Sequence, residues 1–221
     1  MDIHESVRNR RSIRKFLDKP VPQKTLQELV SNALWSPSWG NTQPWEFILA
    51  TGEPLERFKK ANRSALLSGK KPTPEIPMPS AWPNVMKARY VHIGRSVLDA
   101  QSIDRKDMDG RLKYYGDMFS LFGAQALLLL MLDKNLLIEY AMLDIGLFLQ
   151  TFMLLTHARG LGSIALAASV NYPGILRDHF PIPIDRRIVM GVAVGWPDPN
   201  APVNQFQRKR AAFDDCGIWI N

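Results

Sequence analysis

The second half of the chain contains two apolar runs of strand length with a longer apolar segment between them. Residues 124–132 read AQALLLLML, and residues 187–195 read RIVMGVAVG. Neither run alternates between polar and apolar positions, so both are predicted to be strands buried on both faces, although the pattern leaves a helix open for the first. Residues 137–159 are apolar nearly all round and predict a long, central, buried helix that ends at Gly160. A sheet buried on both faces needs helices on each side, so the fold class is α/β or α+β.

The first half offers shorter elements and one irregular stretch. A helix is predicted over residues 25–34, a strand over 45–49 and a short helix over 55–61, and residues 85–120 have the mixed charge of solvated helices. Between them, residues 69–84 contain five prolines, which exclude a regular helix or a central strand. This stretch is either a linker between two domains or an insertion over the surface of one. Because residues 1–68 offer too few elements to close a core, we expect one domain over residues 1–221, with a Pro-rich loop insertion at about 69–84.

The end of the chain is unusually apolar. A short helix is predicted over residues 174–180, ahead of the second buried strand. The tail, residues 210–221, closes on Ile218, Trp219 and Ile220 before the final asparagine. We expect such a tail either to join the sheet or to dock on a partner chain.

The composition is that of a folded, soluble protein. Hydrophobic residues make up 46% of the 221 residues and charged residues 22%, which excludes disorder as the main description. The most apolar region, residues 136–155, is interrupted by Glu139, Asp144 and Gln150, so no membrane span is expected. The polar N-terminus argues against a signal peptide. A single cysteine, Cys216, excludes an internal disulfide and multi-cysteine metal sites and favours a reducing, cytoplasmic location.

Positive charge is concentrated at the two ends of the chain. The net charge is +7, and residues 8–15 carry five cations in eight positions, with a second cluster at residues 208–210. This excess leaves nucleic acid, an acidic membrane or a phosphorylated small molecule open as partners, and a solvated face is the ordinary alternative. We find no nucleic-acid reading motif. Arg10, Arg11 and Arg14 around Ser12 suit a phosphate, because guanidinium groups pair with two phosphate oxygens at once.

Familiar catalytic motifs are missing or stand in the wrong context. Residues 160–165, GLGSIA, match the dinucleotide-binding pattern, but a helix precedes them where a strand is required, so a helix end and a turn is the better interpretation. The four histidines have no metal-ligand spacing, and Cys216 has no activating neighbours. Residues 36–45 combine prolines, amides and tryptophans, which suits either a planar heterocycle or a capped loop with a core tryptophan. If the chain is an enzyme, a cofactor carries the chemistry.

An ordered set of motifs along nearly the whole chain resembles the FMN-dependent nitroreductase family, in the branch that includes nitrobenzoate reductases. The set begins with RRSIRKF at residues 10–16 and SPSWGNTQPWEF at residues 36–47. It continues with Phe122-Gly123-Ala124, Asp144-x-Gly146-x-x-x-Gln150 and the GLGS of residues 160–163. It ends with Gly195-Trp196-Pro197 and Ala201-Pro202-Val203-Asn204.

This resemblance implies a fold, a cofactor and an activity. The fold is α+β, a three-layer arrangement with a central mixed β-sheet flanked by helices, in a homodimer whose C-terminal tails are exchanged between subunits. FMN binds at the dimer interface, NADH or NADPH donates electrons, and a nitroaromatic, a quinone or a related small molecule accepts them in a ping-pong cycle. The alternatives are a flavoenzyme of this fold with other chemistry (reductive dehalogenation, enone reduction or flavin breakdown) or a non-catalytic flavin-binding protein. No metal, nucleic acid or membrane is implied.

The resemblance also assigns cofactor-binding residues, while no side chain is assigned a catalytic role. Arg10, Ser12 and Arg14 reach the FMN phosphate, ribityl chain and pyrimidine edge, with Arg11 beside them, and Arg208 and Arg210 close on the phosphate. The partner subunit contributes Pro37, Ser38, Trp39 and Asn41. The turn Ala165-Leu166-Ala167 packs on the flavin ring and presents a backbone N–H to N5. Many relatives have an asparagine near residues 116–118, where this chain has Gly116, Asp117 and Met118.

Overall fold

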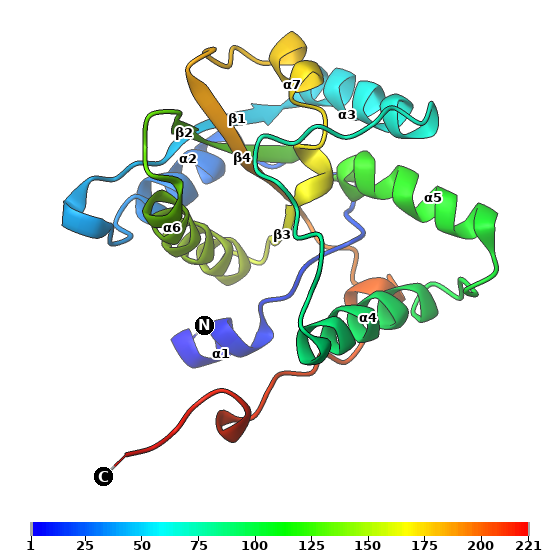
Figure 1. The fold of residues 1–221 in the computed structure, drawn as a ribbon. Helices are drawn as coiled ribbons and strands as arrows, with labels where there is room; N and C mark the ends of the chain where they lie inside the picture. The colour runs from blue at the N-terminus through cyan, green and yellow to red at the C-terminus, as the bar shows by residue number, and fades with distance from the viewer. Residues whose placement is uncertain (1, 221) are drawn as a thin grey trace.

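A four-stranded sheet forms the centre of the computed structural model, which describes residues 2–220 (Figure 1). The strands are β1 (Glu46–Thr51), β2 (Ala126–Asp133), β3 (Gly162–Leu166) and β4 (Arg186–Gly195), in the order β1-β2-β4-β3. Both apolar runs are strands, as predicted, and they pair with each other at the middle of the sheet. All three strand pairs are antiparallel, so the expected mixed sheet is wrong for these strands. Among the described residues, one isolated bridge, between Ser12 and Ser163, is parallel.

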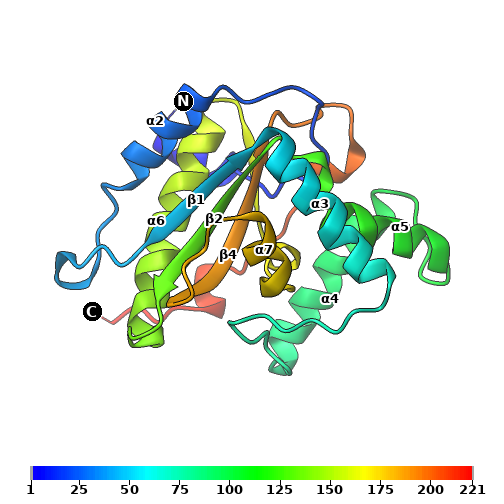
Figure 2. The same cartoon turned by 90° about the horizontal axis from the view of Figure 1, so that it is seen from above.

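Helices cover both faces of the sheet, which gives three layers (Figure 2). One face packs against α2 (Gln23–Ala33) and α6 (Ile138–Ala158), and the other against α3 (Gly52–Leu67), α5 (Met108–Phe119) and α7 (Pro173–His179). Strand β2 serves both layers, because successive side chains of a strand point to opposite faces. Leu128 and Leu130 belong to the first core, and Leu127 and Leu129 belong to the second, all fully buried. The α+β class is confirmed.

Helix α6 lies in an outer layer, so the prediction of a helix buried all round is wrong. Its inner face carries the fully buried Phe148 and Phe152. Its outer face carries Leu137, Tyr140 and Leu143, whose exposed fractions are 66%, 54% and 59%. By length and composition α6 is also able to cross a membrane, a criterion that core helices of soluble proteins meet as well. The apolar outer face of α6 is therefore left exposed in this chain.

The helices differ from the sequence predictions in three regions of the chain. Helix α3 continues to Leu67, well past the predicted residue 61, because the buried Asn62 side chain donates to the carbonyls of Phe119 (2.8 Å) and Ala168 (3.1 Å). The predicted helical region over 85–120 consists of α4 (Asn84–Asp99) and α5, with a turn-rich connection between them. A short helix at the N-terminus, α1 (Ile3–Asn9), was not predicted.

The Pro-rich stretch forms an irregular strap without helix or strand over residues 70–83. Its first half is fastened by Glu75, which pairs with Arg177 (2.7 Å) and accepts from the backbone N–H of Ile188 (2.6 Å). The Thr73 N–H donates to the carbonyl of Asn171 (2.9 Å).

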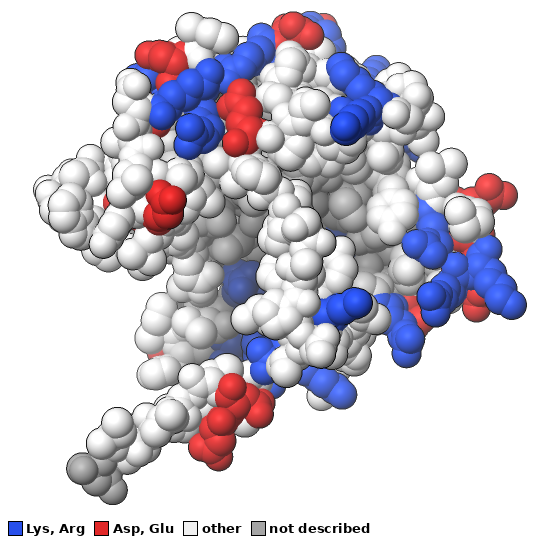
Figure 3. All heavy atoms as spheres, in the orientation of Figure 1, with Lys and Arg blue, Asp and Glu red and all other residues white. Residues whose placement is uncertain are grey.

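Figure 3 shows this face of the molecule hollowed, with Lys and Arg side chains inside the hollow.

The C-terminal tail extends away from the body of the molecule (Figure 1). Ile218 and Ile220 are 88% and 87% exposed, and residues 217–220 join no strand. The sequence led us to expect that the tail either joins the sheet or docks on a partner chain. The described part of the tail does not join the sheet of its own chain.

Candidate functional site

The two ends of the chain meet through the side chain of Asn204. Its Oδ1 accepts from the backbone N–H of Arg14 (2.8 Å), and its Nδ2 donates to the carbonyl of Lys15 (2.8 Å). The Arg11 guanidinium donates to the Asn204 carbonyl (2.6 Å). Asn204 is buried, so these bonds are shielded from water. The segments that carry the two basic clusters are therefore held side by side, about 190 residues apart in sequence.

A cavity of about 120 Å³ lies between these segments, and its lining is almost entirely cationic. The guanidinium of Arg208 fastens its rim by donating to the carbonyls of Arg8 (2.6 Å) and Arg10. The lining residues, which we call the arginine pocket, are Arg10, Arg11, Ser12, Arg14, Phe206, Arg208 and Arg210. All six cofactor-binding residues that the sequence placed at the phosphate, ribityl chain and pyrimidine edge thus line one cavity.

The arginine pocket has the electrostatics of an anion site. Burial, followed by the charge of Arg210, lowers the pKa of Arg10. Burial also lowers the pKa of Arg208, and Arg11, Arg210 and Arg10 lower it further. These lowered pKa values mean that the cations repel one another at a site where water cannot fully solvate them. Within residues 2–220, the buried Nε of Arg10 has no hydrogen-bond partner. An anion with several acceptor oxygens in the pocket offsets the repulsion between the cations.

Arg14 connects the arginine pocket to a larger cavity of about 850 Å³ beside α5. Burial lowers the pKa of Arg14, and the charge and hydrogen bond of Tyr114 partly offset this effect. Tyr114 itself is buried on α5, and burial raises its pKa. Asp117 also lines this larger cavity. Sequence analysis missed Tyr114, because its partner lies 100 positions away and no local pattern marks the pair.

The start of β3 lies beside the N-terminal segment, since Ser12 bridges Ser163 and the N–H of Ile13 donates to the Ser163 carbonyl (3.1 Å). This approach depends on Gly162, where a Cβ atom would lie 2.5 Å from Cγ1 of Ile13. Ala165 and Ala167 are half-buried, whereas Leu166 is buried in the core. The Leu166 side chain is therefore occupied, and only the backbone of this residue is available to a ligand.

The loop with Pro37, Ser38, Trp39 and Asn41 lies away from the arginine pocket, and none of these residues lines it. The N–H of Trp39 donates to Oδ1 of the buried Asp144 in α6 (3.0 Å). His157, whose pKa responds to Arg10 and Arg208, lies near the other end of the same helix. Thirteen residues of helix separate Asp144 from His157, or about 20 Å at ~1.5 Å per residue. Within one chain the loop and the arginine pocket are separate.

A family comparison decides the identity of this fold. The model of the nitroreductase family matches residues 7–196, which include both segments that carry the motifs from residue 10 to residue 47. The chain belongs to the nitroreductase family.

Individual nitroreductases match this chain over nearly its full length. It is 33% identical to the 4-nitrobenzoate reductase of Pseudomonas putida, over 95% of this chain and 91% of that protein. It is 33% identical to the chloronitrobenzene nitroreductase of Comamonas testosteroni, over 99% of this chain and 97% of that protein. The FMN-dependent nitroreductase NfnB of Mycobacterium smegmatis, solved in complex with NADPH, superposes with a TM-score of 0.92 at 26% identity, over 99% of this chain and 97% of that chain.

The remaining candidate motifs of this nitroreductase have structural roles. Gly160 ends α6 with a φ of +75° and β3 begins at Gly162, so the GLGSIA sequence is a helix end followed by a strand, as interpreted. Across residues 2–220, no group of three or more His, Cys, Asp or Glu side chains is arranged to hold a metal ion. His157 lies in the last turn of α6, where a cation would suit the helix dipole. Burial and the charges of Arg10, Arg208 and Arg11 instead lower its pKa and favour the neutral imidazole.

Proposed function

We propose that this nitroreductase is an FMN-dependent NAD(P)H oxidoreductase that reduces nitroaromatics, quinones or related small acceptors in a ping-pong cycle. The arginine pocket is the observation that supports this function most directly. Its cations come from both ends of the chain and line one cavity, where Arg10, Arg11, Arg14 and Arg208 are half-buried, and a phosphate with close to two negative charges balances them. Two similar proteins are a 4-nitrobenzoate reductase and a chloronitrobenzene nitroreductase, and the similar NfnB structure is that of an FMN-dependent nitroreductase in complex with NADPH.

The residues of the pocket fit the phosphate end of FMN. Arg10, Arg208 and Arg210 bind the phosphate, with Arg11 beside them, and the Ser12 hydroxyl adds a neutral hydrogen bond. Arg11 also holds the pocket together, because its guanidinium donates to the Asn204 carbonyl. We assign the ribityl chain and the pyrimidine edge to the passage that leads past Arg14 into the larger cavity.

When bound, FMN supplies the hydride chemistry, and the protein supplies placement and charge. The half-buried Arg14 places a fixed cation near the pyrimidine edge, where a neighbouring positive charge favours the acceptance of hydride. Backbone N–H groups of the turn at Ala165, Leu166 and Ala167 orient the ring and offer no acidic proton to it. No side chain needs to act as a general acid or base on this assignment.

The proposed active form is a homodimer in which each flavin site uses both subunits. The apolar outer face of α6 is the surface that a second copy covers, and the exposed end of the tail is the segment that exchanges. In this arrangement Pro37, Ser38, Trp39 and Asn41 of one subunit reach the flavin of the other, although they lie away from the arginine pocket of their own chain. Each chain then contributes one domain, residues 1–221, with the strap as its insertion.

Light scattering tests the dimer with two matched variants. Leu143→Glu places a charge on the outer face of α6, and Leu67→Glu places one on an exposed leucine at the end of α3. We expect the wild type and Leu67→Glu to have the mass of two chains and Leu143→Glu to be monomeric and to bind FMN poorly. A monomeric wild type that still binds FMN tightly would contradict the two-subunit site.

The function itself is tested by colour and by turnover. Purified protein is expected to be yellow, to lose its flavin absorbance on addition of NADH or NADPH under anaerobic conditions, and to recover it with nitrobenzoate or a quinone. Turnover of a halogenated phenol without nitro or quinone reduction would favour reductive dehalogenation. A colourless protein that takes up no FMN would refute the proposal. A cytoplasmic location agrees with the single free cysteine, Cys216.

A further inference from the structure

Three buried side-chain atoms have no hydrogen-bond partner among residues 2–220: Arg10 Nε, His157 Nε2 and Asn62 Oδ1. Two of these atoms belong to residues that line the same small cavity, of about 250 Å³, at the end of α6. Buried polar atoms in proteins nearly always have a partner, so two in one cavity indicate a missing link between them. Asn62 lies elsewhere, and its amide nitrogen is already bonded.

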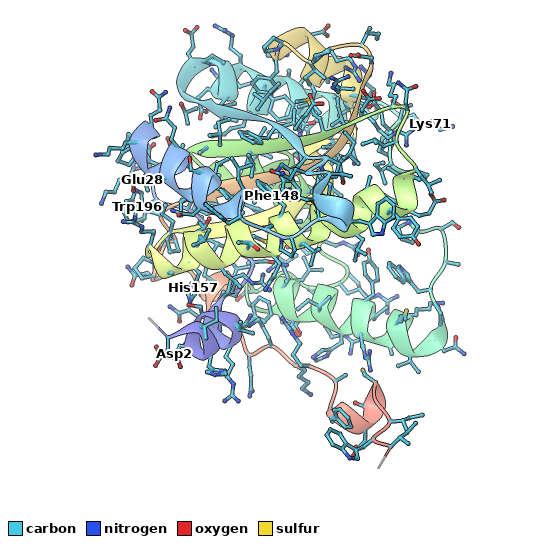
Figure 4. All side chains as sticks on the ribbon, turned by 90° about the vertical axis from the view of Figure 1, so that its left-hand side faces the viewer. Asp2, Glu28, Lys71, Phe148, His157 and Trp196 are labelled. Carbon is cyan, nitrogen blue, oxygen red and sulfur yellow. The ribbon has the colours of Figure 1, made fainter. Side chains whose placement is uncertain are left out.

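Arg10 lies between this cavity and the arginine pocket, because it lines both. It follows directly after α1, which packs against the last turns of α6. Figure 4 shows His157 at the end of α6 that faces α1. His157 and the arginine pocket therefore have Arg10 as a common neighbour.

The charges around His157 keep one of its ring nitrogens available as an acceptor. Burial lowers its pKa first, and the cations of Arg10, Arg208 and Arg11 lower it further. A neutral imidazole has one N–H donor and one bare nitrogen, and a cationic neighbour favours the tautomer that turns the bare nitrogen toward it. We assign that nitrogen to Nε2, whereas the Nε of Arg10 can only donate.

We propose that His157 is a positioning residue for the cofactor phosphate. One water in the shared cavity accepts from Arg10 Nε–H and donates to His157 Nε2. This link fixes the rotation of the guanidinium, so that its two terminal nitrogens face the arginine pocket. A cavity with room for a water and two polar partners meets the usual requirement for an ordered internal water. The inference rests on the proposed FMN function, since the phosphate concerned is that of FMN.

A double-mutant cycle on FMN affinity tests the link. His157→Leu removes the acceptor at similar size, and Arg10→Lys keeps the charge but removes Nε. In the wild-type background, His157→Leu is expected to weaken FMN binding about 5- to 15-fold, the effect of losing one hydrogen bond. In the Arg10→Lys background, the same change is expected to alter affinity less than twofold. Equal effects in both backgrounds would overturn the proposal.

Three comparisons separate positioning from a general structural effect. His157→Gln retains an acceptor and is expected to keep most of the affinity, whereas an equal loss with Gln and Leu would count against the link. Riboflavin has no phosphate, so its affinity is expected to be unchanged by His157→Leu. His157→Met provides a second apolar variant if Leu prevents folding, with the same expectations. If wild-type protein binds no FMN, the proposed function fails. If it binds FMN and the cycle is additive, only the role of His157 fails.

Discussion

Replacing Arg10 by alanine tests the placement of the cofactor phosphate most directly. Arg208 donates to two backbone carbonyls, whereas Arg10 lines the arginine pocket and its Nε has no partner in the described part of the chain. The side chain of Arg10 is therefore the more available of the two for a ligand. A hydrogen bond to a charged group contributes about 1.5–3 kcal/mol, so Arg10→Ala is expected to weaken FMN binding about 10- to 150-fold.

The stability of the flavin-free protein is not expected to fall with FMN affinity when Arg10 is replaced by alanine. Burial and the charge of Arg210 disfavour the charged form of Arg10 in the folded state. Removing this cation relieves that repulsion, so the melting temperature of flavin-free Arg10→Ala is expected to stay constant or to rise. A general loss of fold would lower both quantities together. Affinity for FMN and stability therefore separate a binding role from a structural one.

Titration of flavin-free protein with FMN, followed by quenching of flavin fluorescence, measures the effect. Riboflavin is the matched control ligand, because it shares the ring and ribityl chain but has no phosphate. Arg208→Ala is expected to weaken FMN binding within the same range, in part because it also releases the carbonyls of Arg8 and Arg10. Unchanged FMN affinity in both variants, or an equal loss for riboflavin, would show that the phosphate is wrongly placed.

Four further outcomes follow from the structure. Gly162→Ala is expected to lower the free energy of unfolding in urea by about 1–3 kcal/mol, because its Cβ would lie 2.5 Å from Ile13 Cγ1. Gly94→Ala, with open space around it, should stabilise α4, and equal effects of the two changes would contradict this reasoning. Asp144→Ala is expected to weaken FMN binding by releasing the Trp39 loop, and Asp144→Asn to retain most of it, as flavin titration would show. Folding lowers the pKa of His157, so the folded, flavin-free protein binds a proton at His157 less readily than the unfolded chain does. The free energy of unfolding is therefore expected to fall as the pH drops below about 6.5, and His157→Gln should flatten this part of the pH dependence. FMN at about 100 times its Kd should stabilise the protein by about 2.7 kcal/mol and raise its Tm by roughly 5–11 °C, and no shift would argue against a native-state site.

Secondary structure was most predictable where the hydrophobic pattern and the local turn residues agree. Strands β2 and β4 and helix α2 follow directly from apolar spacing, and Gly160 marks the end of α6. The length of α3 was not predictable, because Asn62 is stabilised there by carbonyls of Phe119 and Ala168 that come from distant segments. Such tertiary bonds override local propensity and leave no trace in the neighbouring sequence.

The burial of α6 could not be judged from one chain. An apolar helix surface predicts contact with other apolar surface but does not distinguish the core of one subunit from the interface between two. Residues on both sides of α6 are equally hydrophobic in the sequence, yet Phe148 is fully buried and Leu143 is 59% exposed. The pattern was interpreted correctly as an apolar environment and incorrectly as the interior of this chain.

The sequence likewise identified some residues of the candidate site and missed others. Five arginines and Ser12 near the two ends were identified from local composition and from the family resemblance, and the structure brings all six residues to one cavity. Tyr114 and His157 were not identified, because each acts through a contact with a residue more than 90 positions away. Sequence patterns locate residues that bind a ligand directly more readily than residues that hold those binders in place.

Asn204 explains how so much positive charge is held together before any anion binds. Mutual repulsion alone would separate the N-terminal and C-terminal clusters, since lowered pKa values show that their charges oppose one another. The neutral amide of Asn204 resists this by bonding Arg14, Lys15 and Asp198 through backbone groups, all within 3.0 Å. An aspartate at this position would lose both Nδ2 bonds and place a carboxylate oxygen against two carbonyls. The pocket is therefore organised by a side chain without charge, which holds its arginines close together before the phosphate binds and lowers the further entropic cost of binding.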